Sequence, residues 1–260
     1  MAGQDANLLK RLYSLEGKTA IVTGGSRGIG AMIARGFVEC GVRTYIVARN
    51  GGDCDAAARE LGRDGTCVSL PADLGTVDAV GRFADAFRAR EDRLDILVNN
   101  AGAAWGAPFE DYPEKGWDKV FDINLKSLFF LTQKLLPLLK AAATPDDPAR
   151  VINLSSINGL TNPHMNNYAY SASKAGVAHL TRHLASDLAA HDINVNAIAP
   201  GWFPSRMTAH FTDGMLKAIP RGRPGSPDDA AGAAIFLSSR ASAWITGVVL
   251  PLDGGAVAAA

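Results

Sequence analysis

The sequence contains few cysteines and no long hydrophobic run, which argues against several classes of protein. Its three cysteines, Cys40, Cys54 and Cys67, include no pair with C-x-x-C spacing. We therefore expect neither a disulfide framework nor a zinc site, and a reducing compartment, the cytoplasm, fits best. No apolar stretch reaches membrane-spanning length, and the first 14 residues lack the apolar core of a secretory signal.

An excess of charge of one sign is also missing. The 26 Lys and Arg residues balance 26 Asp and Glu residues, so the formal net charge is zero. This balance gives no reason to expect a nucleic acid or an anionic membrane surface as a partner. The five histidines show no metal-ligand spacing with carboxylates, so we expect no metal site.

What the sequence does contain is an alternation of short β-rich runs with longer helical stretches. Strands are expected at residues 19–22, 43–47, 66–70, 95–98, 151–154, 193–198 and 248–250, and the two longest helices at 124–139 and 170–190. Such alternation predicts an α/β fold: a single Rossmann-type, doubly wound, seven-stranded parallel sheet with helices on both faces. We expect residues 1–16 to form an N-terminal arm and residues 17–260 one dinucleotide-binding catalytic domain, with a lid at about 201–225.

A glycine-rich segment follows the first expected strand and opens a helix. Its glycines, Gly24, Gly28 and Gly30, have the spacing G-x-x-x-G-x-G. Glycines let the backbone approach a pyrophosphate closely, and the helix N-terminus offers unpaired N–H groups to the anion. The alternative is a tight turn without a ligand. In this βαβ context we predict that the turn binds a dinucleotide through Gly24, Ser26, Arg27, Gly28, Ile29 and Gly30.

The end of the second expected strand indicates which dinucleotide is bound. A carboxylate there would bind a ribose 2′-hydroxyl, but the strand is followed by Ala48, Arg49 and Asn50. A guanidinium pairs with a 2′-phosphate through two parallel hydrogen bonds, and Arg27 could supply a second cation. The sequence therefore predicts NADP(H), unless Arg49 is merely solvated.

Tyr170 and Lys174 are four residues apart at the start of an expected helix, which puts both side chains on one face. An ammonium group near a phenol favours the phenolate and lowers the phenol pKa, so the pair could move a proton to or from an alcohol oxygen. Tyr168 is the alternative, but Ala172 is the residue four beyond it and cannot tune it. Alone, the Tyr-x-x-x-Lys string is a weak signal.

Several motifs in order give this string its weight. The chain resembles the short-chain dehydrogenase/reductase family from about Gly17 to Gly255. The resemblance rests on Thr23–Gly30, Asp73-Leu74, Asn99–Gly102, Asn124, Ser155-Ser156, Tyr170-x-x-x-Lys174, Pro200-Gly201 and Asp253–Gly255. It implies an NADP(H)-dependent enzyme that interconverts a ketone and a secondary alcohol.

The resemblance also implies roles for single residues. Tyr170 would donate the proton, and Lys174 would lower its pKa and hold the nicotinamide ribose. Ser156 would hydrogen-bond the substrate oxygen, with Ser155 as its competitor, and Asn124 would support a water that links Lys174 to solvent. The implied cofactor neighbours are Asp73 and Leu74 at the adenine, Asn100, Ala101 and Gly102 along the cofactor, and Pro200 and Gly201 at the nicotinamide. Two helix-capping alternatives stay open: Asn124 could cap the long helix, and Asp73 the helix after the third strand.

Four further segments stand at residues Leu97–Gly106, Glu110–Pro113, Pro148–Asn153 and Ala199–Thr208. They are similar to a rhamnolipid-associated 3-oxoacyl reductase branch of the family, which suggests a 3-oxoacyl thioester or another apolar β-keto compound as substrate. Candidate pocket residues are Trp105, Trp202, Phe203 and Met207, although some of these could pack in the core. The family's dimer faces imply a homotetramer or a homodimer. The alternative activity is oxidation of a polyol, a sugar acid or a sterol alcohol. A remote alternative is a non-catalytic dinucleotide-sensing regulator.

Overall fold

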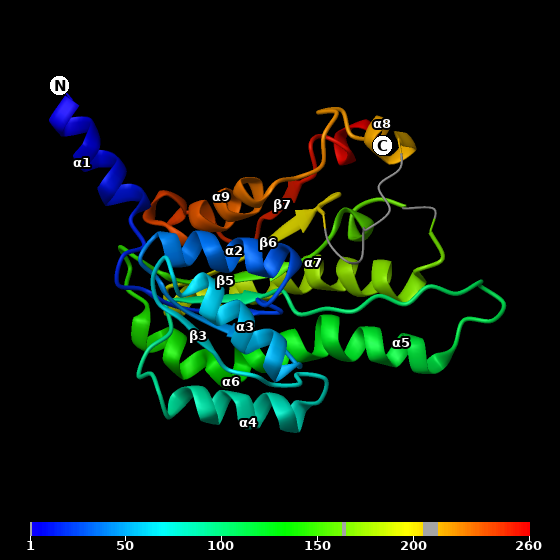
Figure 1. The fold of residues 1–260 in the computed structure, drawn as a ribbon, viewed down its shortest axis with the longest axis horizontal. Helices are drawn as coiled ribbons and strands as arrows, with labels where there is room; N and C mark the ends of the chain where they lie inside the picture. The colour runs from blue at the N-terminus through cyan, green and yellow to red at the C-terminus, as the bar shows by residue number, and fades with distance from the viewer. Residues whose placement is uncertain (1, 163–164, 205–212) are drawn as a thin grey trace.

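The fold is a parallel sheet covered by helices on both faces (Figure 1). The computed structural model describes residues 2–162, 165–204 and 213–260. In these residues seven strands pair in the order β3-β2-β1-β4-β5-β6-β7, and every pairing is parallel. The strands are β1 (Thr19–Thr23), β2 (Arg43–Val47), β3 (Cys67–Ser69), β4 (Ile96–Asn99), β5 (Ala149–Leu154), β6 (Ile193–Pro200) and β7 (Val249–Leu252). The predicted fold class is confirmed.

The strand order reverses between β1 and β4, and this position determines where a ligand can bind. Strands that follow β1 in the chain first build outward to β3, and then the chain returns to build from β4 to β7. In open parallel sheets the connections on the two sides of such a reversal diverge and leave a crevice at the carboxyl ends of the strands. The segments that follow β1, β4 and β5 all begin at this edge.

The helices divide between two hydrophobic cores, one on each side of the sheet. They are α1 (Ala2–Tyr13), α2 (Gly28–Glu39), α3 (Gly51–Leu61), α4 (Val77–Arg88), α5 (Glu114–Phe121), α6 (Ser127–Ala142), α7 (Tyr168–Leu188), α8 (Asp213–Lys217) and α9 (Pro227–Ser238). Residues of α2, α3 and α9 form one core, and residues of α4, α6 and α7 belong to the other. Figure 1 shows α2 and α9 on one side of the sheet and α4 and α6 on the opposite side.

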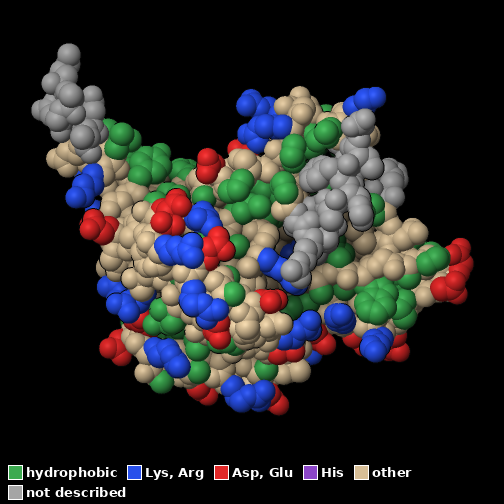
Figure 2. All heavy atoms as spheres, in the orientation of Figure 1, with side chains coloured by type: hydrophobic (Ala, Val, Ile, Leu, Met, Phe, Trp, Pro, Cys, Tyr) green, Lys and Arg blue, Asp and Glu red, His purple; other side chains and the backbone are tan. Residues whose placement is uncertain are grey.

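Alternation along the strands explains why both cores form. Val22 packs in the core under α2, whereas its neighbour Ile21 packs in the core under α6. Successive side chains of a strand point to opposite faces, so a strand that is apolar at every position is buried on both. All five residues of β1 are accordingly buried. Among the described residues, Asp95, Arg150 and Lys174 are the charged side chains that are buried. Figure 2 shows charged side chains of both signs interspersed over the visible face.

Short polar side chains fix where several helices begin. Asn50 accepts a hydrogen bond from the backbone of Asp53 at the start of α3, and Ser226 and Asp229 form a reciprocal capping box at the start of α9. Thr76 caps α4 by accepting from the backbone of Ala79. The suggestion that Asp73 caps this helix is therefore wrong, because Asp73 instead accepts from Gly75 in the preceding turn.

Residues 114–142 form one unbroken helical run, whereas the sequence predicts a helix that begins only at residue 124. The run consists of α5, a π-helical turn at Asp122–Lys126, and α6. The interpretation of Asn124 as an N-cap is therefore wrong: Asn124 lies inside the π-helical turn. A π-turn widens the helix locally and is often found at functional sites.

The N-terminal segment is helical and leaves the body of the molecule. Helix α1 projects away from the sheet (Figure 1), and its side chains Leu8, Leu9 and Tyr13 are exposed. Leu15, in contrast, is buried in the core that includes α2. The buried body thus begins at Leu15. Across the described ranges, no helix combines the length and apolar character needed to cross a lipid bilayer.

Candidate active site

The glycine turn after β1 has the geometry that a pyrophosphate needs. Gly24 and Gly28 have φ angles of 66° and 55°, a region that residues with a Cβ rarely adopt. A Cβ on Gly30 would lie 2.4 Å from the carbonyl oxygen of Gly24 and from Nδ2 of Asn100. Helix α2 begins at Gly28 with no acidic residue in its first turn and no side-chain cap from Arg27. Its first N–H groups are thus available to an anion, and the turn fits a dinucleotide.

Two polar side chains hold the turn against the end of β4. The hydroxyl of Thr23 accepts hydrogen bonds from the backbone N–H groups of Asn100 and Ala101, both at 2.9 Å. Asn100 in turn donates from Nδ2 to the carbonyl oxygens of Thr23 and Gly24 at 2.8 and 3.3 Å. The structure therefore brings the glycine turn and residues 100–102 together, as the sequence predicts. Thr23 is a residue whose role sequence reasoning missed, although its buried hydroxyl directly precedes the glycines.

The two candidate 2′-phosphate ligands are exposed cations near this turn. Arg49 follows the end of β2, and Arg27 lies in the glycine turn itself. Asp73 is also exposed, whereas the side chain of Leu74 is only 4% exposed and packs in the core. Of this pair, only Asp73 therefore offers a side chain to an adenine ring.

Helix α7 carries the two residues expected to move protons. Tyr170 lies in its first turn and Lys174 one turn later, with the Lys174 ammonium 5.7 Å from the centre of the Tyr170 ring. Of the two serines after β5, Ser155 donates to the carbonyl oxygen of Lys174 at 2.8 Å and is buried. Ser156 instead hydrogen-bonds the Tyr170 phenol. The geometry therefore favours Ser156 as the serine that meets a substrate oxygen.

Burial shifts the two titratable groups of α7 in opposite directions. Burial raises the pKa of the Tyr170 phenol above its usual value, and the hydrogen bond from Ser156 lowers it to a smaller extent. Burial also lowers the pKa of the Lys174 ammonium to about 8, and this group donates to the carbonyl oxygen of Leu154 at 2.6 Å. The sequence predicts a lowered phenol pKa. In the structure the pKa of the phenol is raised instead, because desolvation by burial is the larger effect.

Asn124 connects the loop after β4 to helix α7. Its Oδ1 accepts from the backbone N–H of Ala103 at 2.8 Å, and its Nδ2 donates to the Ala103 carbonyl at 3.0 Å. The same Nδ2 donates to the hydroxyl of Ser173 at 2.9 Å. Sequence reasoning missed Ser173, which gives no signal beyond its place inside the Tyr-x-x-x-Lys string.

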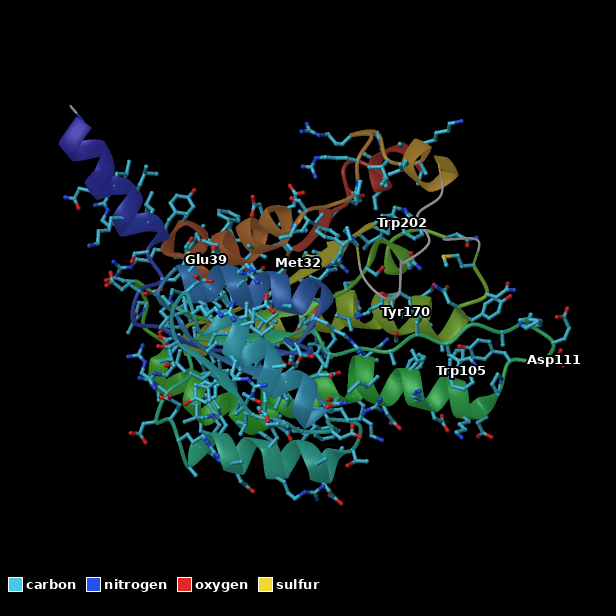
Figure 3. The ribbon with its side chains drawn as sticks, viewed as in Figure 1. Met32, Glu39, Trp105, Asp111, Tyr170 and Trp202 are labelled. Atoms are coloured by element: carbon cyan, nitrogen blue, oxygen red, sulfur yellow. The ribbon has the colours of Figure 1, made fainter. Side chains whose placement is uncertain are left out.

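The four candidate pocket residues differ in where the structure places them. Trp105 lies in the loop after β4, with its indole against Gly116 and the ammonium of Lys119 5.5 Å from the ring centre. Phe203 is 2% exposed and packs in the core over Gly225, so it is not a free pocket wall. In the view of Figure 3, Tyr170 lies between the partly buried Trp202 and the segment that bears Trp105. Met207 lies outside the described residues.

The segment after β6 closes the edge of the site. Pro200 is the last, buried residue of β6, and a Cβ on Gly201 would lie 2.9 Å from the Cα of Asp253. The backbone N–H of Gly201 donates to Leu252 at 3.0 Å, which joins the ends of β6 and β7. Within the described ranges no three His, Cys, Asp or Glu side chains gather as metal ligands.

Comparison with known proteins identifies the family to which this arrangement belongs. Residues 24–257 match the family model described as "Enoyl-(Acyl carrier protein) reductase". The rhamnolipids biosynthesis 3-oxoacyl-[acyl-carrier-protein] reductase of Pseudomonas aeruginosa is 48% identical over 249 residues, which cover 94% of this chain and 97% of that protein. The chain belongs to the short-chain dehydrogenase/reductase family. It is therefore an oxidoreductase of that family.

Other members of the family extend the comparison. The gluconate 5-dehydrogenase of Gluconobacter oxydans is 35% identical and covers 94% of this chain and 96% of its own length. A solved structure described as the "Pseudomonas aeruginosa RhlG/NADP active-site complex" has a TM-score of 0.92 at 47% identity, covering 95% of this chain and 99% of that one. The predicted family membership is thus confirmed over nearly the whole chain.

Proposed function

We propose that the protein is an NADP(H)-dependent reductase that converts a ketone, and specifically a 3-oxoacyl thioester or a similar apolar β-keto compound, to a secondary alcohol. One observation carries the proposal. The phenol of Tyr170 and the hydroxyl of Ser156 meet in a hydrogen bond at the carboxyl edge of the sheet, the same edge at which the glycine turn can bind a dinucleotide.

The residues of this site divide the chemistry between them. NADPH, when bound, supplies the hydride that reduces the carbonyl carbon. Tyr170 donates its phenolic proton to the carbonyl oxygen, while Ser156 hydrogen-bonds that oxygen as negative charge develops on it. A phenol is protonated near neutral pH, which is the form that reduction requires, and burial raises the pKa of Tyr170 further. Lys174 provides the cation that stabilises the phenolate left behind.

Cations near the glycine turn support NADP(H) over NAD(H). Arg49 and Arg27 are exposed, and the end of β2 carries no carboxylate that would bind a 2′-hydroxyl. Relatives whose structures are described with NADP support the same preference. The remaining cofactor contacts are proposed at Gly24, Ser26, Gly28, Ile29 and Gly30 of the turn, at Asp73 and Leu74, at Asn100, Ala101 and Gly102, at Tyr170 and Lys174, and at Pro200 and Gly201.

The choice of substrate rests on the relatives and on Trp105. The 48% identical relative is named as a 3-oxoacyl reductase, and Trp105, in the loop after β4, offers an indole that suits an apolar chain. A second candidate is oxidation of a sugar acid, because a gluconate 5-dehydrogenase that is 35% identical covers 94% of this chain. The two candidate substrates differ in polarity: a 3-oxoacyl chain is apolar, whereas a sugar acid is polar and charged.

Assembly and compartment belong to the same proposal. We propose a homotetramer in which α6 and α7 lie at the contacts between copies, because the exposed face of α7 bears small residues such as Ala172 and Ala175 that permit close helix approach. Light scattering tests this mass directly. The three free thiols fit a cytoplasmic location.

A screen of NADPH consumption tests the proposed function. The panel holds 3-oxoacyl thioesters of two chain lengths, a cyclic ketone and a 5-keto sugar acid, and gluconate with NADP⁺ tests the reverse direction. We expect the highest kcat/KM for a 3-oxoacyl thioester with NADPH. A preference for the sugar acid would select the second candidate, and no turnover on any carbonyl would reject both.

A further inference from the structure

Ser173 lies between the two residues of the Tyr-x-x-x-Lys string and is fully buried. Its hydroxyl donates to the backbone carbonyl of Tyr170 at 2.8 Å and accepts from Nδ2 of Asn124 at 2.9 Å. In an α-helix the carbonyl of Tyr170 is already the acceptor for the N–H four residues later. The bond from Ser173 is therefore additional to what the helix itself requires.

All hydrogen bonds of the Asn124 side chain in the structure are made with Ala103 and Ser173. Its Nδ2 spends both protons, one on the carbonyl of Ala103 and one on Ser173, and its Oδ1 accepts from the N–H of Ala103. One continuous series of hydrogen bonds thus runs from Ala103, in the loop after β4, through Asn124 and Ser173 to the turn that bears Tyr170. Asn124 and Ser173 are both buried, so water does not compete for these bonds.

We propose that Ser173 is a positioning residue, which holds the first turn of α7 against Asn124 so that the Tyr170 phenol stays in place beside Ser156. This inference rests on the proposed function, because Tyr170 is there the proton donor. Small displacements of a reacting group reduce turnover strongly while leaving binding intact. The proposal assigns Asn124 a mechanical role, exerted through Ser173, on the phenol.

The same helix provides a matched control. Thr181 is also fully buried, its hydroxyl donates to the carbonyl of Val177 at 2.8 Å, and it accepts from Nδ2 of Asn153 at 3.0 Å. It repeats the bonding pattern of Ser173 about two turns further along α7, away from Tyr170. Thr181→Val therefore removes an equivalent hydroxyl whose loss should affect stability alone.

The experiment compares Ser173→Ala with Thr181→Val in kcat, ketone KM, NADPH affinity, melting temperature and the titration of the phenol. The phenol is followed by ultraviolet difference absorbance, with Tyr170→Phe as the reference that isolates Tyr170 from the other four tyrosines. We expect Ser173→Ala to lower kcat about tenfold, with KM and NADPH affinity changed less than about twofold. Its Tyr170 phenol should titrate at higher pH, because the bond from Ser156 is loosened.

Each outcome decides the inference. In Thr181→Val we expect a lower melting temperature with wild-type kcat and phenol titration. If Ser173→Ala behaves in the same way as Thr181→Val, Ser173 is structural only and the inference is wrong. If the wild type reduces no ketone, the proposed function fails, and the phenol titration of the ligand-free protein still decides whether Ser173 positions Tyr170.

Discussion

Burial shifts the pKa values of two single residues in the site. It disfavours the charged form of both Tyr170 and Lys174, so the phenol holds its proton more tightly and the ammonium loses its proton more readily. The phenol is therefore protonated near neutral pH, and its loss of a proton to a substrate needs a hydrogen bond and a cation that stabilise the phenolate. Lys174 donates one of its three N–H groups to the carbonyl oxygen of Leu154, and its ammonium lies 5.7 Å from the centre of the Tyr170 ring.

The pKa of Lys174 predicts a pH dependence of stability. Its folded-state pKa of about 8 lies below the usual 10.5, so between these values the unfolded chain binds more protons. Stability contributed by this residue therefore rises as pH increases from 8 to 10, by up to about 3 kcal/mol. Urea unfolding of wild type and Lys174→Met, at one protein concentration from pH 7 to 10, measures the difference. Parallel pH profiles for the two proteins would show that Lys174 does not titrate in this range.

Arg49 is expected to set the cofactor preference. Arg49→Asp should raise the KM for NADPH at least about tenfold and improve the use of NADH relative to it, because a carboxylate repels the 2′-phosphate and can bind a 2′-hydroxyl. Steady-state kinetics with both cofactors measure the ratio. Arg59→Asp, an exposed arginine on α3, is the control and should leave the ratio unchanged. An unchanged ratio in Arg49→Asp would remove Arg49 from the cofactor site.

At the scale of elements, hydrophobic periodicity predicted most of the fold, and contacts between residues far apart in the sequence decided the rest. The strands and the cap at Ser226 follow from apolar runs and capping residues, which act through neighbours in sequence. The start of the long helical run did not follow. Asn124 is polar and resembles a cap, but its partners Ala103 and Ser173 are 21 and 49 residues away, so only the folded chain reveals that it lies within the helix.

The same distinction holds for the site. The residues of the glycine turn and of α7 stand in short strings and were predicted, whereas Phe203 was placed in the pocket because it is apolar. Its burial over Gly225 depends on a contact across 22 residues that no local pattern encodes. The direction of the Tyr170 pKa shift also depended on burial, which the four-residue spacing to Lys174 does not specify.

The glycine turn yields a prediction at this scale. Gly30→Ala places a methyl 2.4 Å from the carbonyl of Gly24, so the turn must open and NADPH affinity should fall at least about tenfold. Gly232→Ala, on α9, meets no atom within 4 Å and should instead stabilise the protein by about 0.5–1 kcal/mol. Fluorescence titration with NADPH and thermal melts distinguish the two. Wild-type affinity in Gly30→Ala would show that this close contact is not required.

At the scale of the whole molecule, topology gathers the site from distant parts of the chain. The reversal between β1 and β4 brings the glycine turn and Asn100 to one edge, and β5 delivers Ser156 to the same edge. Two separate cores hold the sheet from both faces, so the edge at which these residues meet is set by the fold rather than by any one loop. Function on this scaffold follows from which side chains line that edge.

The proposed function depends most on the transfer of a proton from Tyr170 to the substrate oxygen. The direct measurement is turnover of a 3-oxoacyl thioester by wild type and Tyr170→Phe, with NADPH affinity determined for both proteins. We predict that Tyr170→Phe loses at least about 99% of kcat and binds NADPH with unchanged affinity, because only the hydroxyl is removed. Turnover near the wild-type rate in Tyr170→Phe, with NADPH bound equally well, would contradict the proposed chemistry.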